Sequence, residues 1–260
     1  MSHRAFYVTD GDTLVPTELT RGPWDPDAQH AGPPAALLGR AIERCEPRDD
    51  VQVGRITVEI LGPVPLAPLT TTAAMVRPGR GVEMLEATLA GPDGDVMRAR
   101  AWRLRLSDQV LDPPPPADPP PPGPDEGEPR EFFPTGHDAG YHTAMELRFV
   151  SGAFLEPGPA MVWMRARVPL VEGEETTPLE RVLIAADAGN GVSAALDWRR
   201  YLFINTDLSV HLKRLPAGEW VGVDAVTYPE PHGVGLADTV LWDERGRLGR
   251  GAQTLVVRAR

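Results

Sequence analysis

The sequence is poor in cysteine and in long apolar runs. Its 260 residues include one cysteine, Cys45. A lone cysteine excludes a disulfide framework and a cysteine metal cluster, and it fits a reducing compartment, so we predict a cytoplasmic protein. No apolar run approaches the roughly 20 residues of a membrane span. Residues 1–6 lack the apolar core and cleavage site of a signal peptide. We therefore expect no membrane association.

Positive charge is also scarce, and the formal net charge is −11. Nucleic-acid binding needs a basic face, so nucleic acid is not an expected partner. A local pair such as Arg199 and Arg200 can still meet a phosphorylated ligand, although a plain surface pair is the simpler interpretation. The chain also has no Gly-x-Ser-x-Gly elbow, so it lacks the nucleophile signature of a serine hydrolase.

Proline, in contrast, is concentrated in the middle of the chain. Two runs of four prolines, at 113–116 and 119–122, alternate with acidic residues. Such a segment cannot bury a core and predicts an extended, semi-rigid spacer, with an SH3-type ligand as the alternative. We predict an N-terminal domain over residues 1–110, a proline-rich linker over 111–136 and a C-terminal domain over 137–260.

The two halves contain similar strings at one constant spacing. Residues 56–60 (Ile-Thr-Val-Glu-Ile) match residues 208–212 (Leu-Ser-Val-His-Leu), and the turn at 92–96 matches the turn at 244–248. The same spacing pairs Gly81-Val82 with Gly233-Val234. Because the spacing holds without a gap, we interpret it as an internal duplication of one fold.

Hydrophobic periodicity predicts the same elements in each half. The first half should hold a strand at 5–8, a helix over 32–44, and strands at about 51–61, 67–77, 81–90 and 95–106. The second half should hold strands at about 143–150 and 160–168, a helix from Pro178, and strands at about 202–213, 219–228, 233–243 and 251–259. The expected fold class is α+β, with two antiparallel sheets, each wrapped around one long helix.

Alternation in the strand at 202–213 predicts which side chains share a face. Ile204, Thr206 and Leu208 should lie on one face, and Asn205 and Asp207 on the other.

One helix in the second half carries an isolated acid. Thr177, Pro178 and Glu180 form a helix start with a capping box. The helix is apolar almost all round and should be buried, and Asp187 is the acid in its last turn. Gly189 and Gly191 should end the helix through a left-handed backbone. A carboxylate in such surroundings must be solvated, paired or used in chemistry.

Several strings resemble those of a known family when taken in order. They are residues 30–38 (HAGPPAALL), 186–191 (ADAGNG), 205–212 (NTDLSVHL) and 251–258 (GAQTLVVR). Together they resemble acyl-CoA thioesterase II, the TesB-like branch of the thioesterases with a double hot-dog fold. The resemblance covers nearly everything except the proline-rich segment.

The resemblance implies hydrolysis of fatty acyl-CoA thioesters, without a cofactor or metal, by polar residues that orient a water molecule. The family's aspartate carries over to Asp187 and its glutamine to Gln253. The family's threonine falls on Asn205, with the neighbouring Thr206 as the other candidate. Gly189, Arg199 and Arg200 are expected to bind substrate, and assembly into a homo-oligomer stays open.

Each of these residues also has a purely structural interpretation. Asp187 can cap the amides at 189–190, Gln253 can face solvent, and Asn205 can start a strand. His30 is expected to contact the start of a helix, although a vestigial site in the first half is an alternative.

Two other functions are compatible with the same fold. A protein that binds an acyl thioester without hydrolysing it is the first. An enoyl-CoA hydratase is the second, but it would need an aspartate–histidine pair, and no histidine follows Asp187 closely in the sequence.

Overall fold

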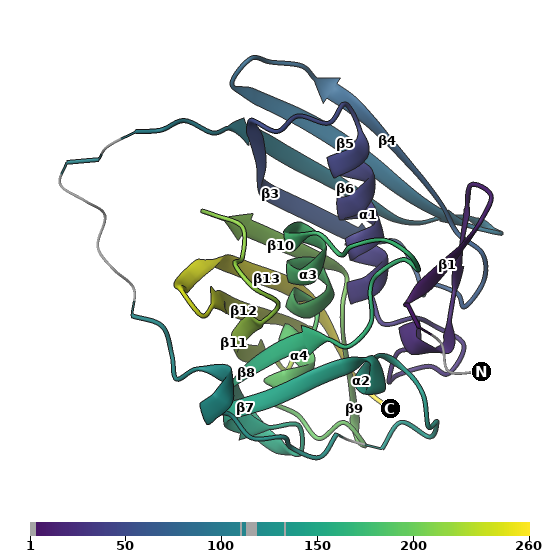
Figure 1. Ribbon diagram of the computed structural model, residues 1–260. Helices are drawn as coiled ribbons and strands as arrows, with labels where there is room; N and C mark the ends of the chain where they lie inside the picture. Colours follow the sequence, from purple (N-terminus) through teal and green to yellow (C-terminus); the bar gives the residue numbers. More distant parts are fainter. Residues whose placement is uncertain (1–3, 110, 113–118, 133) are drawn as a thin grey trace.

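The computed structural model describes residues 4–109, 111–112, 119–132 and 134–260 (Figure 1). Its strands are β1 Tyr7–Asp10, β2 Thr13–Pro16, β3 Val51–Ile60, β4 Thr70–Arg77, β5 Val82–Gly91, β6 Gly94–Arg105, β7 Met145–Ala153, β8 Glu156–Ala166, β9 Tyr201–Asn205, β10 Asp207–Leu212, β11 Val221–Pro229, β12 Val234–Asp243 and β13 Gly246–Ala259. The α-helices are α1 Gly32–Arg44, α2 Tyr141–Ala144, α3 Pro178–Ala186 and α4 Gly189–Val192. Short 3₁₀ turns occupy Glu18–Thr20 and Pro124–Glu126.

The strands of both halves join into one antiparallel sheet. Its order is β4-β5-β6-β3-β10-β13-β12-β11-β8-β7, with β9 also paired to β13, and β1 and β2 form a separate hairpin. The predicted strand positions are confirmed to within a few residues, but the prediction of two separate sheets was wrong. β3 of the first half pairs directly with β10 of the second. This pairing satisfies backbone groups that would otherwise be exposed on two sheet edges.

The β3–β10 seam confirms the internal duplication. Thr57 lies opposite Ser209, and the two hydroxyls are 3.1 Å apart in a hydrogen bond between residues separated by 152 positions. Arg55 lies opposite His211, and Glu59 lies opposite Asp207. The offset relates Arg55 to Asp207 and Glu59 to His211, so it exchanges the two pairs. A local twofold axis therefore passes between Thr57 and Ser209, as in the isologous interface of a homodimer.

The two main helices pack against each other on one side of the sheet (Figure 1). A Cβ on Gly39 of α1 would lie 2.5 Å from Cδ1 of Leu183 in α3, so a larger residue there would require the Leu183 side chain to move. The predicted burial of α3 is confirmed, because Val182, Leu183 and Ile184 are fully buried.

The prediction of one long helix in each half was wrong for the second half. α1 has 13 residues, whereas α3 has only 9 and is followed, after a turn at Asp187 and Ala188, by the short helix α4. Gly189 and Gly191 lie within α4 and are not left-handed ends of a helix. A Cβ on Gly189 would come within 2.6 Å of the Thr239 hydroxyl, so packing, and not backbone conformation, requires glycine at this position.

The strand predicted at 202–213 is interrupted at Thr206. The Asp207 carboxylate accepts a hydrogen bond from the Thr254 N–H, a role that a strand carbonyl would normally fill. The predicted alternation is therefore broken, and Thr206 is exposed although Leu208 is buried. In the first half, the position equivalent to Thr206 is Gly54, which lies at the register shift between Val53 and Arg55 in β3.

The proposed division into domains stays a prediction, since residues 110, 113–118 and 133 lie outside the described ranges. Parts of the predicted linker that are described contact the second half. The Trp163 indole N–H donates to the Pro122 carbonyl at 2.7 Å, and Glu128 exchanges backbone hydrogen bonds with Phe149.

A buried acid between the two helices gives a prediction about stability. Glu180 is 3% exposed, and burial raises its pKa to about 7. The unfolded chain ionises this group near pH 4.5, so the folded state loses stability as the pH rises from 4.5 through 7. We expect Glu180→Gln to remove this loss and to be more stable than the parent protein at pH 8 by as much as about 3 kcal/mol.

The measurement is the thermal midpoint of the parent and the variant from pH 5 to pH 8. The exposed neighbour Glu175 provides the matched control, and Glu175→Gln should follow the parent curve. A Glu180→Gln curve parallel to the parent curve would show that this carboxyl does not hold its proton in the folded state.

Candidate active site

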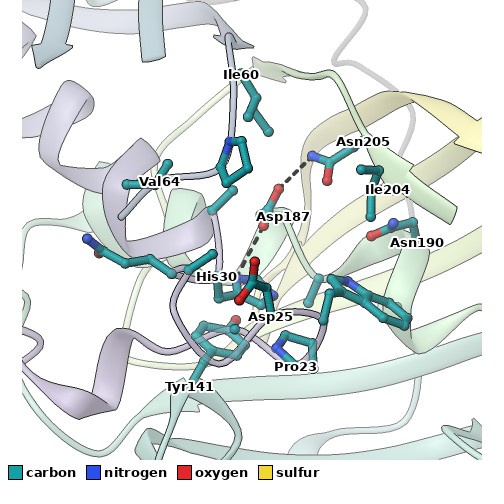
Figure 2. A pocket seen from close by; sticks show the side chains of 18 of the residues that line it. Pro23, Asp25, His30, Ile60, Val64, Tyr141, Asp187, Asn190, Ile204 and Asn205 are labelled. Carbon is teal, nitrogen blue, oxygen red and sulfur yellow. Dashed lines mark hydrogen bonds and ion pairs between the residues drawn. The ribbon is translucent and has the colours of Figure 1, made fainter. Parts of the chain in front are cut away.

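Asp187 lies where α3 ends, and its side chain is the meeting point of several polar groups. The residue is 5% exposed and lines a cavity. Its Oδ1 accepts hydrogen bonds from Asn205 Nδ2 at 2.8 Å and from Gln253 Nε2 at 3.4 Å. Its Oδ2 lies 3.2 Å from Nδ1 of His30. Figure 2 shows the carboxylate between His30 and Asn205.

Gln253 comes from β13 and is 1% exposed. Its Nε2 donates to the Asp187 carbonyl at 3.0 Å, and its Oε1 accepts from the Asn190 N–H at 3.1 Å. The amide therefore holds both sides of the turn between α3 and α4. This clamp fixes the backbone that carries Asp187.

Asn205 is the last residue of β9, just before the interruption of the strand. Its Nδ2 donates to Asp187 Oδ1 and also to the Asp207 carbonyl at 3.2 Å. The Thr206 hydroxyl, by comparison, lies 3.4 Å from Asp207 Oδ1 and 3.4 Å from the Thr254 carbonyl on the exposed side. Of these two candidates, Asn205 is the one that contacts Asp187.

His30 belongs to the first half, in the loop that leads into α1. Its ring stacks on Tyr141 with centroids 3.7 Å apart and an angle of 5° between the planes. Sequence reasoning placed His30 at a helix start and did not connect it with Asp187. The only signal was its position directly before Ala31-Gly32, a string already attributed to the family.

The presence of His30 also corrects one argument about function. The sequence places no histidine near Asp187 in the second half, but the fold brings one from the first half. An aspartate–histidine pair is therefore present, so its absence cannot be used against a hydratase.

Burial governs the electrostatics of the aromatic and imidazole groups around the carboxylate. Burial lowers the pKa of His30, and the negative charge of Asp187 acts in the opposite direction. Burial raises the pKa of Tyr141 well above its usual value, and the charge of Asp187 adds to this effect. Both rings are therefore held neutral in the ordinary pH range, beside the carboxylate.

The cavity beside Asp187 has a volume of about 440 Å³ and a mostly apolar lining from both halves. The apolar side chains include Trp24, Ile60, Val64, Phe132, Phe154, Met164, Leu202 and Ile204. The described lining does not include Gly189, Arg199 or Arg200. The Arg199 guanidinium is paired with Asp197 at 3.0 Å, and the Arg200 guanidinium lies 5.6 Å from the Tyr201 ring centroid.

The two amides that hold Asp187 have no polar counterparts at the equivalent positions of the first half. At the offset of 152 residues, Asn205 and Gln253 correspond to Val53 and Ala101 of the first half. Val53 is 4% exposed and Ala101 is fully buried. The first half therefore has apolar core where the second half has amides that hold a carboxylate.

Within the described ranges, no group of three or more His, Cys, Asp and Glu side chains is placed to hold a metal ion. No described helix is long and apolar enough to cross a membrane.

Comparison with known proteins assigns both halves of the chain. A family model of the acyl-CoA thioesterase N-terminal domain matches residues 20–104, and a model of the acyl-CoA thioesterase C-terminal domain matches residues 113–257. None of the curated proteins compared with the chain matches it.

Solved structures support the fold. A conserved protein of unknown function with a hot-dog fold from Alicyclobacillus acidocaldarius is 16% identical, with a TM-score of 0.72, covering 98% of this chain and 96% of that one. The tesB protein of Mycobacterium avium subspecies paratuberculosis is 14% identical, with a TM-score of 0.66, covering 95% and 92%.

Acyl-CoA thioesterase II TesB2 of Mycobacterium marinum is 13% identical, with a TM-score of 0.59, covering 82% of this chain and 83% of that one. At such identities the likeness shows the hot-dog fold, while the two domain matches show the family. The chain therefore belongs to the acyl-CoA thioesterase family and is a thioester hydrolase.

Proposed function

We propose that the protein hydrolyses fatty acyl-CoA thioesters to the free acid and coenzyme A, with a water molecule activated by Asp187. The observation that carries this proposal is the carboxylate itself. It is buried, lines an apolar cavity, and has a separate protein group on each of its oxygens. Coenzyme A is the expected thiol because the family hydrolyses acyl-CoA.

The reaction proceeds by attack of water on the thioester carbonyl carbon. Asp187 accepts a proton from the water as the new carbon–oxygen bond forms. The tetrahedral intermediate then collapses with cleavage of the carbon–sulfur bond, and the thiolate of coenzyme A takes up the proton. A positioned base contributes roughly 10²- to 10⁴-fold to such a step.

The start of α1 is the proposed source of donors for the developing oxyanion. Ala31 lines the cavity and Gly32 begins the helix, so their amides lie at its positive end. Pro33 and Pro34 have no N–H, which restricts the donors in this turn to Ala31 and Gly32. An oxyanion donor typically contributes about 3–4 kcal/mol to the transition state.

Gln253 and Asn205 act on Asp187 in different ways in this proposal. Gln253 fixes the backbone of the turn, and Asn205 fixes the carboxylate. The amide of Asn205 also carries an acceptor oxygen, which suits it to orient the attacking water.

Asn205→Ala provides a test of this assignment. Loss of a hydrogen bond to a charged group should lower kcat by about 10- to 100-fold. Thr206→Val is the matched control, because the Thr206 side chain is exposed and should be neutral. Steady-state thiol release gives both values. A larger loss in Thr206→Val than in Asn205→Ala would assign the role to the threonine.

The proposed function is tested by thiol release from acyl-CoA substrates of increasing chain length, without added metal. We expect release from medium- or long-chain substrates, because the cavity lining is apolar and drawn from both halves. Binding without release at every length would favour an acyl-thioester-binding protein.

The His30–Asp187 pair makes a hydratase the second candidate. Incubation with crotonyl-CoA distinguishes the two functions, because hydration consumes the double bond without releasing thiol. Hydration of crotonyl-CoA without thiol release from saturated substrates would support the hydratase.

A further inference from the structure

The contact between His30 and Asp187 joins the two halves of the molecule at the site. His30 precedes α1 of the first half, and Asp187 caps α3 of the second. The Tyr141 ring holds the imidazole by its face, and the Tyr141 hydroxyl donates to the Ile184 carbonyl at 2.7 Å. The imidazole is therefore fixed in orientation by a residue that is itself anchored to α3.

Two polar groups converge on the same imidazole nitrogen. Nδ1 lies 3.2 Å from Asp187 Oδ2, and the Gly32 N–H is directed at the same nitrogen as a donor at 3.1 Å. An imidazole nitrogen has one in-plane bonding direction, so it either donates to the carboxylate or accepts from the amide. With the proton on Nδ1, the carboxylate gains a donor and the Gly32 N–H is released toward other acceptors.

We propose that His30 is a positioning residue for Asp187, which donates from Nδ1 to Oδ2 and so fixes the carboxylate for attack by water. With Asn205 and Gln253 on Oδ1, each carboxylate oxygen then has a protein donor, and the group cannot rotate. The proposal rests on the proposed function, in which Asp187 is the base. The polar groups in contact with His30 are Asp187 at the end of α3, Tyr141 of α2 and the Gly32 amide at the start of α1; Figure 2 shows His30 beside Asp187 and Tyr141.

Two substitutions separate the hydrogen bond from the ring stack. His30→Phe keeps a ring on Tyr141 but has no nitrogen, whereas His30→Asn keeps an N–H near the position of Nδ1 but loses the stack. We expect His30→Phe to lower kcat about 10- to 100-fold with KM within threefold. His30→Asn should retain most of the turnover. A purely structural role predicts the reverse order.

The division of the effect between kcat and KM gives a second readout. Loss of a hydrogen bond that positions the base should act on kcat in His30→Phe, and both constants should stay close to the parent values in His30→Asn. A raised KM with an unchanged kcat in His30→Phe would overturn the proposal. Circular dichroism confirms that each variant is folded.

The double variant His30→Phe with Asp187→Asn tests whether His30 acts through Asp187. Residues that act as a unit are not additive, so His30→Phe should cost little once Asp187 is replaced. Full additivity would overturn the His30 proposal and leave the proposed function intact. Wild-type turnover by Asp187→Asn alone would instead overturn the proposed mechanism.

Discussion

Asp187→Asn is expected to lower kcat for acyl-CoA hydrolysis by about 10²- to 10⁴-fold, which is the contribution of a positioned general base. An amide has the same shape as the carboxylate but cannot take the proton from water. Its oxygen can still accept from Asn205 and Gln253, so the turn between α3 and α4 should keep its structure. The thermal midpoint should therefore be unchanged or higher. The measurement is thiol release under saturating substrate.

Asp25 provides the matched control for this prediction. Its carboxylate also belongs to the cavity lining, but it is exposed and accepts a hydrogen bond from the Asp27 N–H. Asp25→Asn should leave kcat within about threefold, because the base must be held next to the water it activates. Loss of activity in Asp25→Asn with retention in Asp187→Asn would transfer the role to Asp25.

The largest expected effect on stability belongs to Arg103 in β6. Its guanidinium is 3% exposed and donates to Glu83 Oε1 at 2.8 Å and to the Cys45 and Glu46 carbonyls at 2.9 and 3.1 Å. These bonds tie the end of α1 to the sheet. Arg103→Met would leave a buried carboxylate with a weaker partner, at a cost of about 3–5 kcal/mol.

For a chain of this size such a loss lowers the thermal midpoint by about 6–20 °C. The exposed pair of Arg98 and Asp95 supplies the control, and Arg98→Met should change the stability by less than about 1 kcal/mol. The double variant Arg103→Met with Glu83→Met should recover part of the loss, because it removes the buried charge together with its partner. No recovery would show that the bonds to the α1 carbonyls dominate.

Local chemistry explains what could be predicted from the sequence. The apolar alternation of the strands, the prolines at the start of α1 and the capping box at Thr177 each act over a few residues, and each gave the right element. The constant offset between the halves placed the duplicated strands. It even predicts β12 from β5, because both span ten residues at equivalent positions.

Features that depend on packing could not be predicted in the same way. The joining of the two sheets and the approach of His30 to Asp187 both require the halves to meet in one relative position. Gly189 was predicted to end a helix. Glycine is instead needed at this position because the Thr239 hydroxyl, which is far away in the sequence, packs against it in the fold.

The twofold seam between Thr57 and Ser209 has a consequence for how such a protein can change. In a dimer of identical subunits, every substitution is made twice, so a group that weakens the core weakens it on both sides of the axis. A fused chain is free of this symmetry. Val53 and Ala101 contribute apolar burial on one side, while Asn205 and Gln253 on the other side donate hydrogen bonds to a buried carboxylate. The second half can thus carry the buried carboxylate and the amides that hold it, while the equivalent positions of the first half form apolar core.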